Sequence, residues 1–214
     1  MASSASDPAS AKGKAVCEFA AQRKPRILLA ACGCVTAVKF GYICSCFSCW
    51  AEVKAVVTRA SMRFMGRLSM PLGVPVYTDD HDWGTWKKLG DGMLHIELSR
   101  WADIMVIAPL SANTLGKIEA GLCDNLLTCI VRAWDYSKPF FVAPSMNHLM
   151  WENCFTEKQV MSIDELGISL IPPVITRSAC GKQADCAMAE PSTIYSTVRL
   201  FYEIHVLKKA PGMV

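Results

Sequence analysis

The chain has 214 residues, of which 52% are hydrophobic and 19% are charged, and its net charge is +3. This length usually forms one domain with a substantial core. The small net charge gives no argument for a nucleic-acid partner, and no apolar run approaches the roughly 18 residues of a membrane span. The eleven cysteines are odd in number and scattered, which favours a reducing compartment, so we expect a cytoplasmic protein.

The elements expected in chain order alternate between strand and helix. Residues 1–24 begin small and polar, and we expect this segment to be disordered. Strands are expected at 27–31, 53–58, 74–77, 104–108, 140–142 and 168–171. Helices are expected at 36–50, 59–68, 111–121, 124–134 and 192–207. A surface excursion is expected at 79–91, a loop at 181–189 and a flexible tail at 208–214. This alternation predicts one α/β domain over 25–207, with a parallel sheet covered by helices on both faces.

Two of the expected strands end in a similar way. Pro109–Thr114 and Ala143–Asn147 each combine proline with small polar residues, and each leads from an apolar run into an amphipathic segment. The carboxyl ends of parallel strands meet helix N-termini, whose unpaired N–H groups can bind an anion. The sequence therefore predicts a ligand site for a phosphorylated cofactor or substrate.

The loop chemistry narrows the choice of nucleotide. The turn after the first strand has only Gly33 and lacks the Gly-x-Gly-x-x-Gly fingerprint, and no Gly-Lys-Ser/Thr phosphate loop is present. The remaining candidates for phosphate capture are hydroxyl residues at helix starts, namely Thr36, Thr58, Ser61, Ser111 and Thr114. They suit a mononucleotide such as FMN in a flavodoxin-like sheet. Ordinary helix N-caps would explain the same residues equally well.

A cysteine cluster raises the question of a metal. Cys44, Cys46 and Cys49 are close in sequence, but no second Cys or His pair lies at a useful spacing, and the cluster falls on an expected helix. We therefore expect no metal site.

Several motifs together resemble one enzyme family over about 24–202. They lie at 94–98, 100–103, 108–117, 121–129, 132–135, 144–147, 179–181 and 187–190. The chain is similar to the phosphopantothenoylcysteine decarboxylases, and among them to the plant halotolerance-type flavoproteins. The resemblance implies a flavodoxin-like homotrimer that binds FMN between subunits. It also implies conversion of 4′-phosphopantothenoylcysteine to 4′-phosphopantetheine in coenzyme A biosynthesis, through thiol oxidation, CO2 loss and reduction of the resulting enethiol.

The resemblance also implies roles for individual residues. His95 matches the catalytic histidine that handles a proton, and Cys180 matches the acid that protonates the enethiolate. FMN contacts would be Cys34, Val35, Thr36, Thr58, Arg59, Ala60, Ser111, Ala112, Asn113, Thr114 and Ser145. Substrate contacts would be Asn147, which grips the carboxylate, with Arg177, Ala179 and Met188. Without the family, His95 would more simply be a surface or capping histidine, and Asn147 a helix N-cap.

The chain departs from the family pattern at several points. Cys32-Gly33-Cys34 replaces the usual Ser-Gly-Ser, which exchanges a good hydroxyl donor for a weaker thiol. Ala60 stands where serine is common, and Ser145 replaces an alanine. Residues 181–187 retain one glycine of a glycine-rich flap, and we expect flap closure to be strained.

Two other function classes remain open. Fungal relatives inhibit a protein phosphatase, often through an acidic tail, but this chain has no such tail. The other class is a sister flavoenzyme, such as a decarboxylase of peptidyl cysteine or a flavin prenyltransferase. A decarboxylase of the peptidyl type would share His95 and Asn147. Arg177 and Cys180 favour the phosphopantetheine branch.

Overall fold

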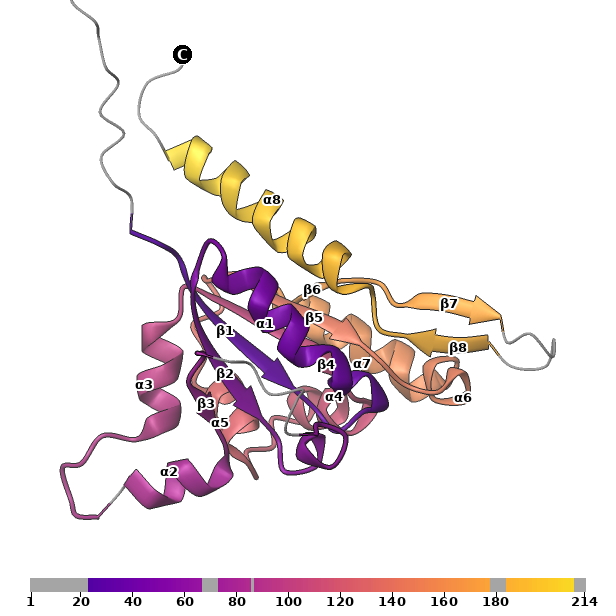
Figure 1. Cartoon of the computed structure of the whole chain (residues 1–214). Helices are drawn as coiled ribbons and strands as arrows, with labels where there is room; N and C mark the ends of the chain where they lie inside the picture. The colour runs from indigo at the N-terminus through magenta and orange to yellow at the C-terminus, as the bar shows by residue number, and fades with distance from the viewer. Residues whose placement is uncertain (1–22, 67–72, 86, 178–183, 210–214) are drawn as a thin grey trace, which may run out of the picture.

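The computed structural model describes residues 23–66, 73–85, 87–177 and 184–209. A parallel sheet lies at the centre of this part of the chain, with the strand order β3-β2-β1-β4-β5-β6 (Figure 1). The strands are β1 (Arg26–Ala31), β2 (Glu52–Val57), β3 (Val76–Tyr77), β4 (Ile104–Leu110), β5 (Phe140–Pro144) and β6 (Ser169–Leu170).

The strand order identifies the topology. Without the two-residue edge strand β3, the order β2-β1-β4-β5-β6 corresponds to the flavodoxin-like arrangement 2-1-3-4-5. The chain therefore has the flavodoxin-like parallel sheet that we expected. The order reverses between β1 and β4, and a crevice for a ligand forms at this point in such sheets.

Alternate residues of each strand enter two separate cores. In β1, Ile27 and Leu29 face one core, whereas Leu28 and Ala30 face the other. Helices α1 (Phe40–Ser48) and α8 (Pro191–Lys209) contribute to the first core. The second core receives α3 (Leu94–Trp101), α4 (Ala112–Glu119), α5 (Leu126–Arg132) and α7 (Cys154–Glu165). Burial on both faces explains why the strands are apolar runs rather than alternating ones.

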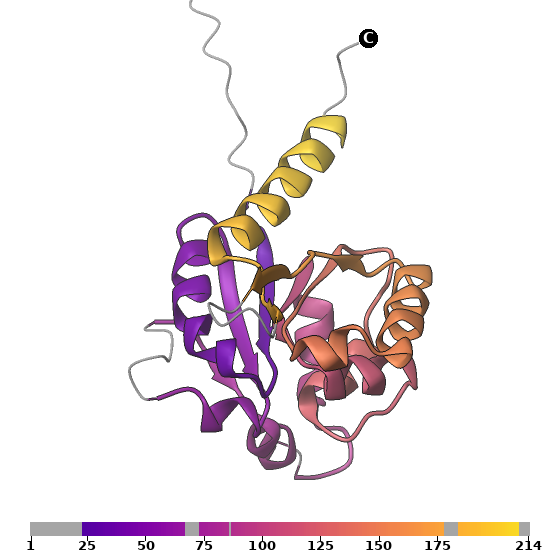
Figure 2. The same ribbon diagram turned by 90° about the vertical axis from the view of Figure 1, so that its right-hand side faces the viewer.

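The remaining elements are short. They are the 3₁₀ turns η1 (Val35–Lys39) and η2 (Ser61–Arg63), the helices α2 (Asp79–Thr85) and α6 (His148–Trp151), and the strands β7 (Val174–Arg177) and β8 (Ala184–Ala187). Strands β7 and β8 pair antiparallel and extend away from the central sheet beside α6 (Figure 1). The C-terminal half of α8 projects beyond the sheet, as Figure 2 shows.

Several sequence expectations about these elements were wrong. The helix expected at 59–68 is only the turn η2, because Thr58 and Ser61 bond locally and offer the backbone an alternative to a helix. The loop expected at 181–189 contains β8, which is stabilised by pairing with β7 rather than by a local pattern. Helix α3, helix α7 and strand β7 were not expected.

Strand β4 also continues beyond the expected end at 108. The carbonyl of Pro109 accepts a hydrogen bond from the N–H of Cys32, so proline keeps its acceptor role in the ladder while lacking a donor. Residues 1–22, 178–183 and 210–214 lie outside the described residues, and with them most of the segment expected to be disordered, the first part of the flap and most of the expected tail. None of the described helices has the length and apolarity needed to cross a bilayer.

Candidate active site

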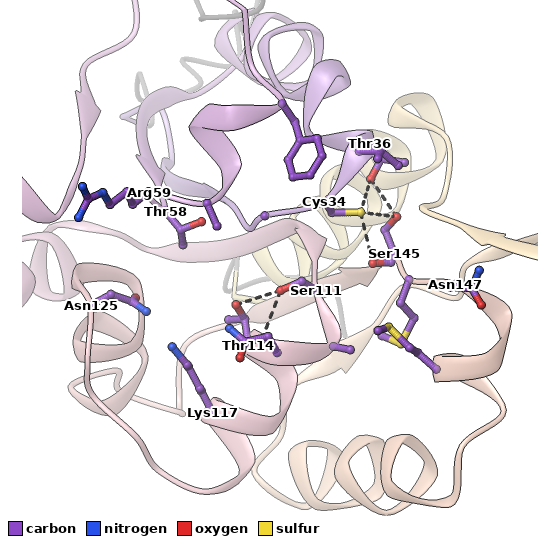
Figure 3. A pocket seen from close by; sticks show the side chains of 18 of the residues that line it. Cys34, Thr36, Thr58, Arg59, Ser111, Thr114, Lys117, Asn125, Ser145 and Asn147 are labelled. Atoms are coloured by element: carbon purple, nitrogen blue, oxygen red, sulfur yellow. Dashed lines mark hydrogen bonds between the residues drawn. The ribbon is translucent and has the colours of Figure 1, made fainter.

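Four strand ends of the sheet open into one cavity of about 940 Å³ (Figure 3). Its walls are the segments that follow β1, β2, β4 and β5, which contribute 33–36, 58–60, 111–114 and 145–147. The cavity thus lies on both sides of the reversal between β1 and β4, where open α/β sheets bind their ligands. Its volume is typical of a pocket for a single organic ligand.

The wall after β4 is the first turn of α4. Ser111 is the N-cap of this helix, and its Oγ accepts a hydrogen bond of 3.3 Å from the backbone N–H of Thr114. This cap leaves the N–H groups of Ala112 and Asn113, which line the cavity, as donors that it does not use. Together with the helix dipole they favour an anion. Ser111 is therefore a helix cap and at the same time part of a wall that is suited to an anion.

The wall after β2 is a tight turn. Thr58 is only 8% exposed, and its Oγ1 accepts a hydrogen bond of 3.2 Å from the N–H of Ser61. The hydroxyl of Ser61 donates in turn to the carbonyl of Thr58, at 2.7 Å. These bonds hold the turn so that Arg59 and Ala60 line the cavity.

The wall after β1 carries two cysteines in different environments. Cys34 lines the cavity, whereas Cys32 lies fully buried beneath it. Burial raises the pKa of the Cys32 thiol to about 11, so this thiol stays neutral at physiological pH. Cys34 instead contacts Thr36 and Ser145, the latter from the segment after β5, and joins the two walls.

Charged residues also border the cavity, and the sequence analysis did not predict them. Lys117 on α4 forms an ion pair with Asp124, and the hydrogen bond from Lys117 lowers the pKa of that carboxyl group. Asp79 accepts a hydrogen bond of 2.9 Å from the N–H of Leu126, at the start of α5. Helical spacing could have indicated Lys117, because it lies one turn beyond Thr114 on the same helix. The other lining residues that were missed are Gly33, Phe64, Asn125, Met146, Met150 and Ala187.

Ser61, which was also expected to capture a phosphate, does not line the cavity. The structure does bring together the residues that the family resemblance implied for the cofactor. Every one of them lines the cavity, namely Cys34, Val35, Thr36, Thr58, Arg59, Ala60, Ser111, Ala112, Asn113, Thr114 and Ser145. Asn147 lines it as well, and its Oδ1 accepts a hydrogen bond of 2.9 Å from Leu149 N–H, so it is also the N-cap of α6. Figure 3 shows Asn147 and Arg59 at opposite ends of the site.

The other expected site residues lie elsewhere. Met188 is 1% exposed in the core beneath α8 and does not line the cavity. Arg177 belongs to β7, whereas Ala179 and Cys180 lie outside the described residues. His95 is in the first turn of α3, with its Nδ1 3.3 Å from Oδ1 of Asp82 on α2, and it does not line the cavity of its own chain. Figure 1 shows α2 and α3 at one flank of the molecule and α6 at the other.

The described cysteines offer no metal centre. Eight of them are free, and no group of three or more His, Cys, Asp or Glu side chains in the described segments could hold a metal ion. Cys44 is buried, whereas Cys49 is exposed.

The chain is similar in sequence and in fold to known flavoproteins. The family model described as "Flavoprotein" matches residues 18–202. The phosphopantothenoylcysteine decarboxylase HAL3a of Glycine max is 70% identical over 198 residues, which cover 92% of this chain and 94% of the relative. A solved structure of a cysteine-to-serine mutant of PPC decarboxylase, complexed with pantothenoylaminoethenethiol, is 66% identical with a TM-score of 0.81, and the match covers 85% of this chain and all of that one. The FMN-binding protein AtHal3 matches with the same identity and TM-score over 85% of this chain and 98% of its own.

Proposed function

We propose that this chain, which belongs to the flavoprotein family, is an FMN-dependent carboxy-lyase that converts 4′-phosphopantothenoylcysteine to 4′-phosphopantetheine in coenzyme A biosynthesis. The observation that carries the proposal is the meeting of four strand ends in one cavity, lined by every residue that the family resemblance implied for the cofactor. The similarity to decarboxylases along most of both chains supports the choice of substrate. The free thiols suit a reducing compartment, and we expect the enzyme in the cytoplasm.

The cavity fits a flavin mononucleotide. A phosphate would meet the N-terminus of α4, where Ser111 and two unused backbone N–H groups line the wall. The ring system needs an apolar slot with a few polar contacts, which Val35, Ala60 and Phe64 can line. When bound, FMN supplies the acceptor and donor of the hydride that the oxidation and reduction require.

The chain's own residues would bind the substrate and move protons. Asn147, at the end of the cavity opposite Arg59, would hold the substrate carboxylate until CO2 leaves. His95 would handle the proton released on thiol oxidation, and Cys180 would protonate the enethiolate. A thiol with a pKa near its ordinary value of roughly 8.5 is a suitable acid at neutral pH. Arg177 and Ala179 would contact the substrate, while the buried Met188 would act by packing behind the site.

The position of His95 bears on assembly. Because His95 does not line the cavity of its own chain, a catalytic role requires the cavity of a neighbouring subunit. A homotrimer with active sites shared between subunits provides this arrangement. Exposed apolar side chains such as Leu149 and Phe155, which are 67% and 68% exposed, offer material for the interfaces.

Purification and mutation test the function. The purified protein should be yellow, release FMN on denaturation, and form CO2 and 4′-phosphopantetheine from the substrate. His95→Asn should retain FMN but block thiol oxidation and CO2 release. A colourless protein that does not take up added FMN would overturn the proposal.

Mixed assemblies test the shared site. His95→Asn chains and Asn147→Asp chains should each be inactive alone. When the two are unfolded and refolded together, some mixed trimers should pair an intact His95 with an intact Asn147 and recover activity. Light scattering should give the mass of three chains, and an active monomer would contradict the shared site.

A further inference from the structure

Three side chains form a hydrogen-bonded cluster in the wall of the cavity, at the junction of the segments after β1 and β5 (Figure 3). The hydroxyl of Thr36 donates to Oγ of Ser145 at 2.9 Å, and the thiol of Cys34 donates to the same oxygen at 3.0 Å. Cys34 and Thr36 also contact each other, with 3.3 Å between Sγ and Oγ1. Ser145 is only 4% exposed, so water does not solvate this cluster freely.

The hydrogen bonds leave the Ser145 proton available as a donor. A serine hydroxyl has one proton to donate and two lone pairs that accept. When Thr36 and Cys34 both donate to Ser145, they occupy both lone pairs of its oxygen, and its own proton is then available to a ligand. Buried polar groups rarely stay unpaired. The Ser145 hydroxyl can therefore donate to a ligand in the cavity that it lines.

The position of Ser145 indicates which part of a bound cofactor its hydroxyl would contact. The wall at Ser111 that is suited to an anion belongs to the segment after β4, whereas Ser145 follows β5, two residues before Asn147. If Asn147 holds the substrate carboxylate, the group beside Ser145 is the one that reacts with the substrate, which is the flavin ring system. The two donors that converge on Ser145 polarise its O–H bond and strengthen its donation.

We propose that the Ser145 hydroxyl, held in place by Thr36 and Cys34, donates a hydrogen bond to an atom of the bound flavin ring that gains electron density when the ring is reduced. This inference rests on the proposed function. It concerns a property of this chain, because the family resemblance implies alanine at 145, and alanine has no hydroxyl. A donor at such an atom stabilises the reduced ring more than the oxidised one. Ser145 would thereby favour hydride transfer from the carbon that bears the substrate thiol.

The reduction potential of the bound flavin tests the inference. Reference-dye titrations of the FMN-loaded proteins should show that Ser145→Ala shifts the equilibrium about tenfold toward oxidised flavin, which for a two-electron couple lowers the potential by about 30 mV. Thr36→Val leaves Ser145 in place but removes one of the donors that orient it. This variant should lower the potential by a smaller amount.

A buried serine away from the cavity provides the control. Ser99 is also 4% exposed, and its hydroxyl donates to the carbonyl of Ile96 at 3.0 Å. Ser99→Ala should leave the potential unchanged. An unchanged or raised potential in Ser145→Ala, or an equal decrease in Ser99→Ala, would overturn the inference, and an unchanged potential in Thr36→Val would overturn the role of the cluster. These results all presuppose a yellow parent protein, whereas a parent without FMN would overturn the proposed function itself.

Discussion

Gly33 lies directly against Ala60 at the floor of the cavity, so that a Cβ on Gly33 would come within 2.5 Å of the Cβ of Ala60. This contact joins the turn after β1 to the turn after β2, and both turns line the site. Side chains in such close contact cannot both be accommodated unless one backbone segment moves.

Gly33→Ala should therefore disturb both stability and cofactor binding. We expect a loss of about 1–3 kcal/mol in the free energy of unfolding, the usual cost of overpacking, together with weaker FMN binding. Thermal unfolding and fluorescence titration of FMN measure the two effects. Gly84→Ala is the matched control, because a Cβ there meets nothing within 4 Å. Parent-like FMN affinity in Gly33→Ala would contradict the role given to this contact.

Variants of two helix N-caps can distinguish the contribution of Ser111 to stability from its contribution to FMN binding. Ser111 caps α4 at the cavity, whereas Asn153 caps α7 by accepting a hydrogen bond of 3.0 Å from Phe155 N–H, away from the cavity. Ser111→Ala and Asn153→Ala should each cost about 1 kcal/mol of stability in denaturant unfolding, because each removes a cap. Only Ser111→Ala should also weaken FMN binding. Equal FMN affinities for the two variants would show that the start of α4 does not hold the cofactor.

One carboxyl group should make stability depend on pH. Burial raises the pKa of Asp103, but hydrogen bonds from Arg23 and from the backbone N–H of Arg26 outweigh this effect and hold the pKa below its ordinary value. The ionised group thus stabilises the fold above the unfolded-state pKa of roughly 3.9, and the contribution is lost as the pH falls through the lowered value. Because Arg23 is largely exposed, we expect Asp103→Asn to cost only about 1 kcal/mol at pH 7. Urea unfolding of the parent protein and Asp103→Asn, at neutral and at strongly acidic pH, measures this loss of unfolding free energy. An equal loss at both pH values would rule out the ionic contribution.

The thiols should differ in reactivity. Burial raises the pKa of Cys32 to about 11 and that of Cys44 to about 12, so both should resist alkylation until the protein unfolds. The exposed Cys49 should react at once, and FMN should protect Cys34, which lines the cavity, without protecting Cys49. Mass spectrometry of timed samples can follow each site. Rapid labelling of Cys32 in the folded protein would be inconsistent with its burial.

Sequence patterns predicted the central sheet and the strand ends at the cavity, whereas the family resemblance implied most of the individual cofactor residues. Apolar runs mark strands that are buried on both faces, and polar strand ends mark the cavity, because both signals are local. The turn at Ser61 and the hairpin partner of Val174–Arg177 were missed, because side-chain bonding and long-range pairing decide them. Lys117 was missed because it reaches the site from the second turn of a helix, away from any strand end. That His95 lies outside the cavity of its own chain depends on how α3 packs in the second core, which no local pattern specifies.

The most direct test of the central claim is to measure CO2 and 4′-phosphopantetheine together in reactions of the parent protein and Cys180→Ser with 4′-phosphopantothenoylcysteine. A serine hydroxyl has a far higher pKa than a thiol and is a poor acid, so the substitution should affect only the last proton transfer. We expect equal amounts of the two products from the parent protein, and CO2 without 4′-phosphopantetheine from Cys180→Ser. A yellow, folded parent protein that releases no CO2 would contradict it.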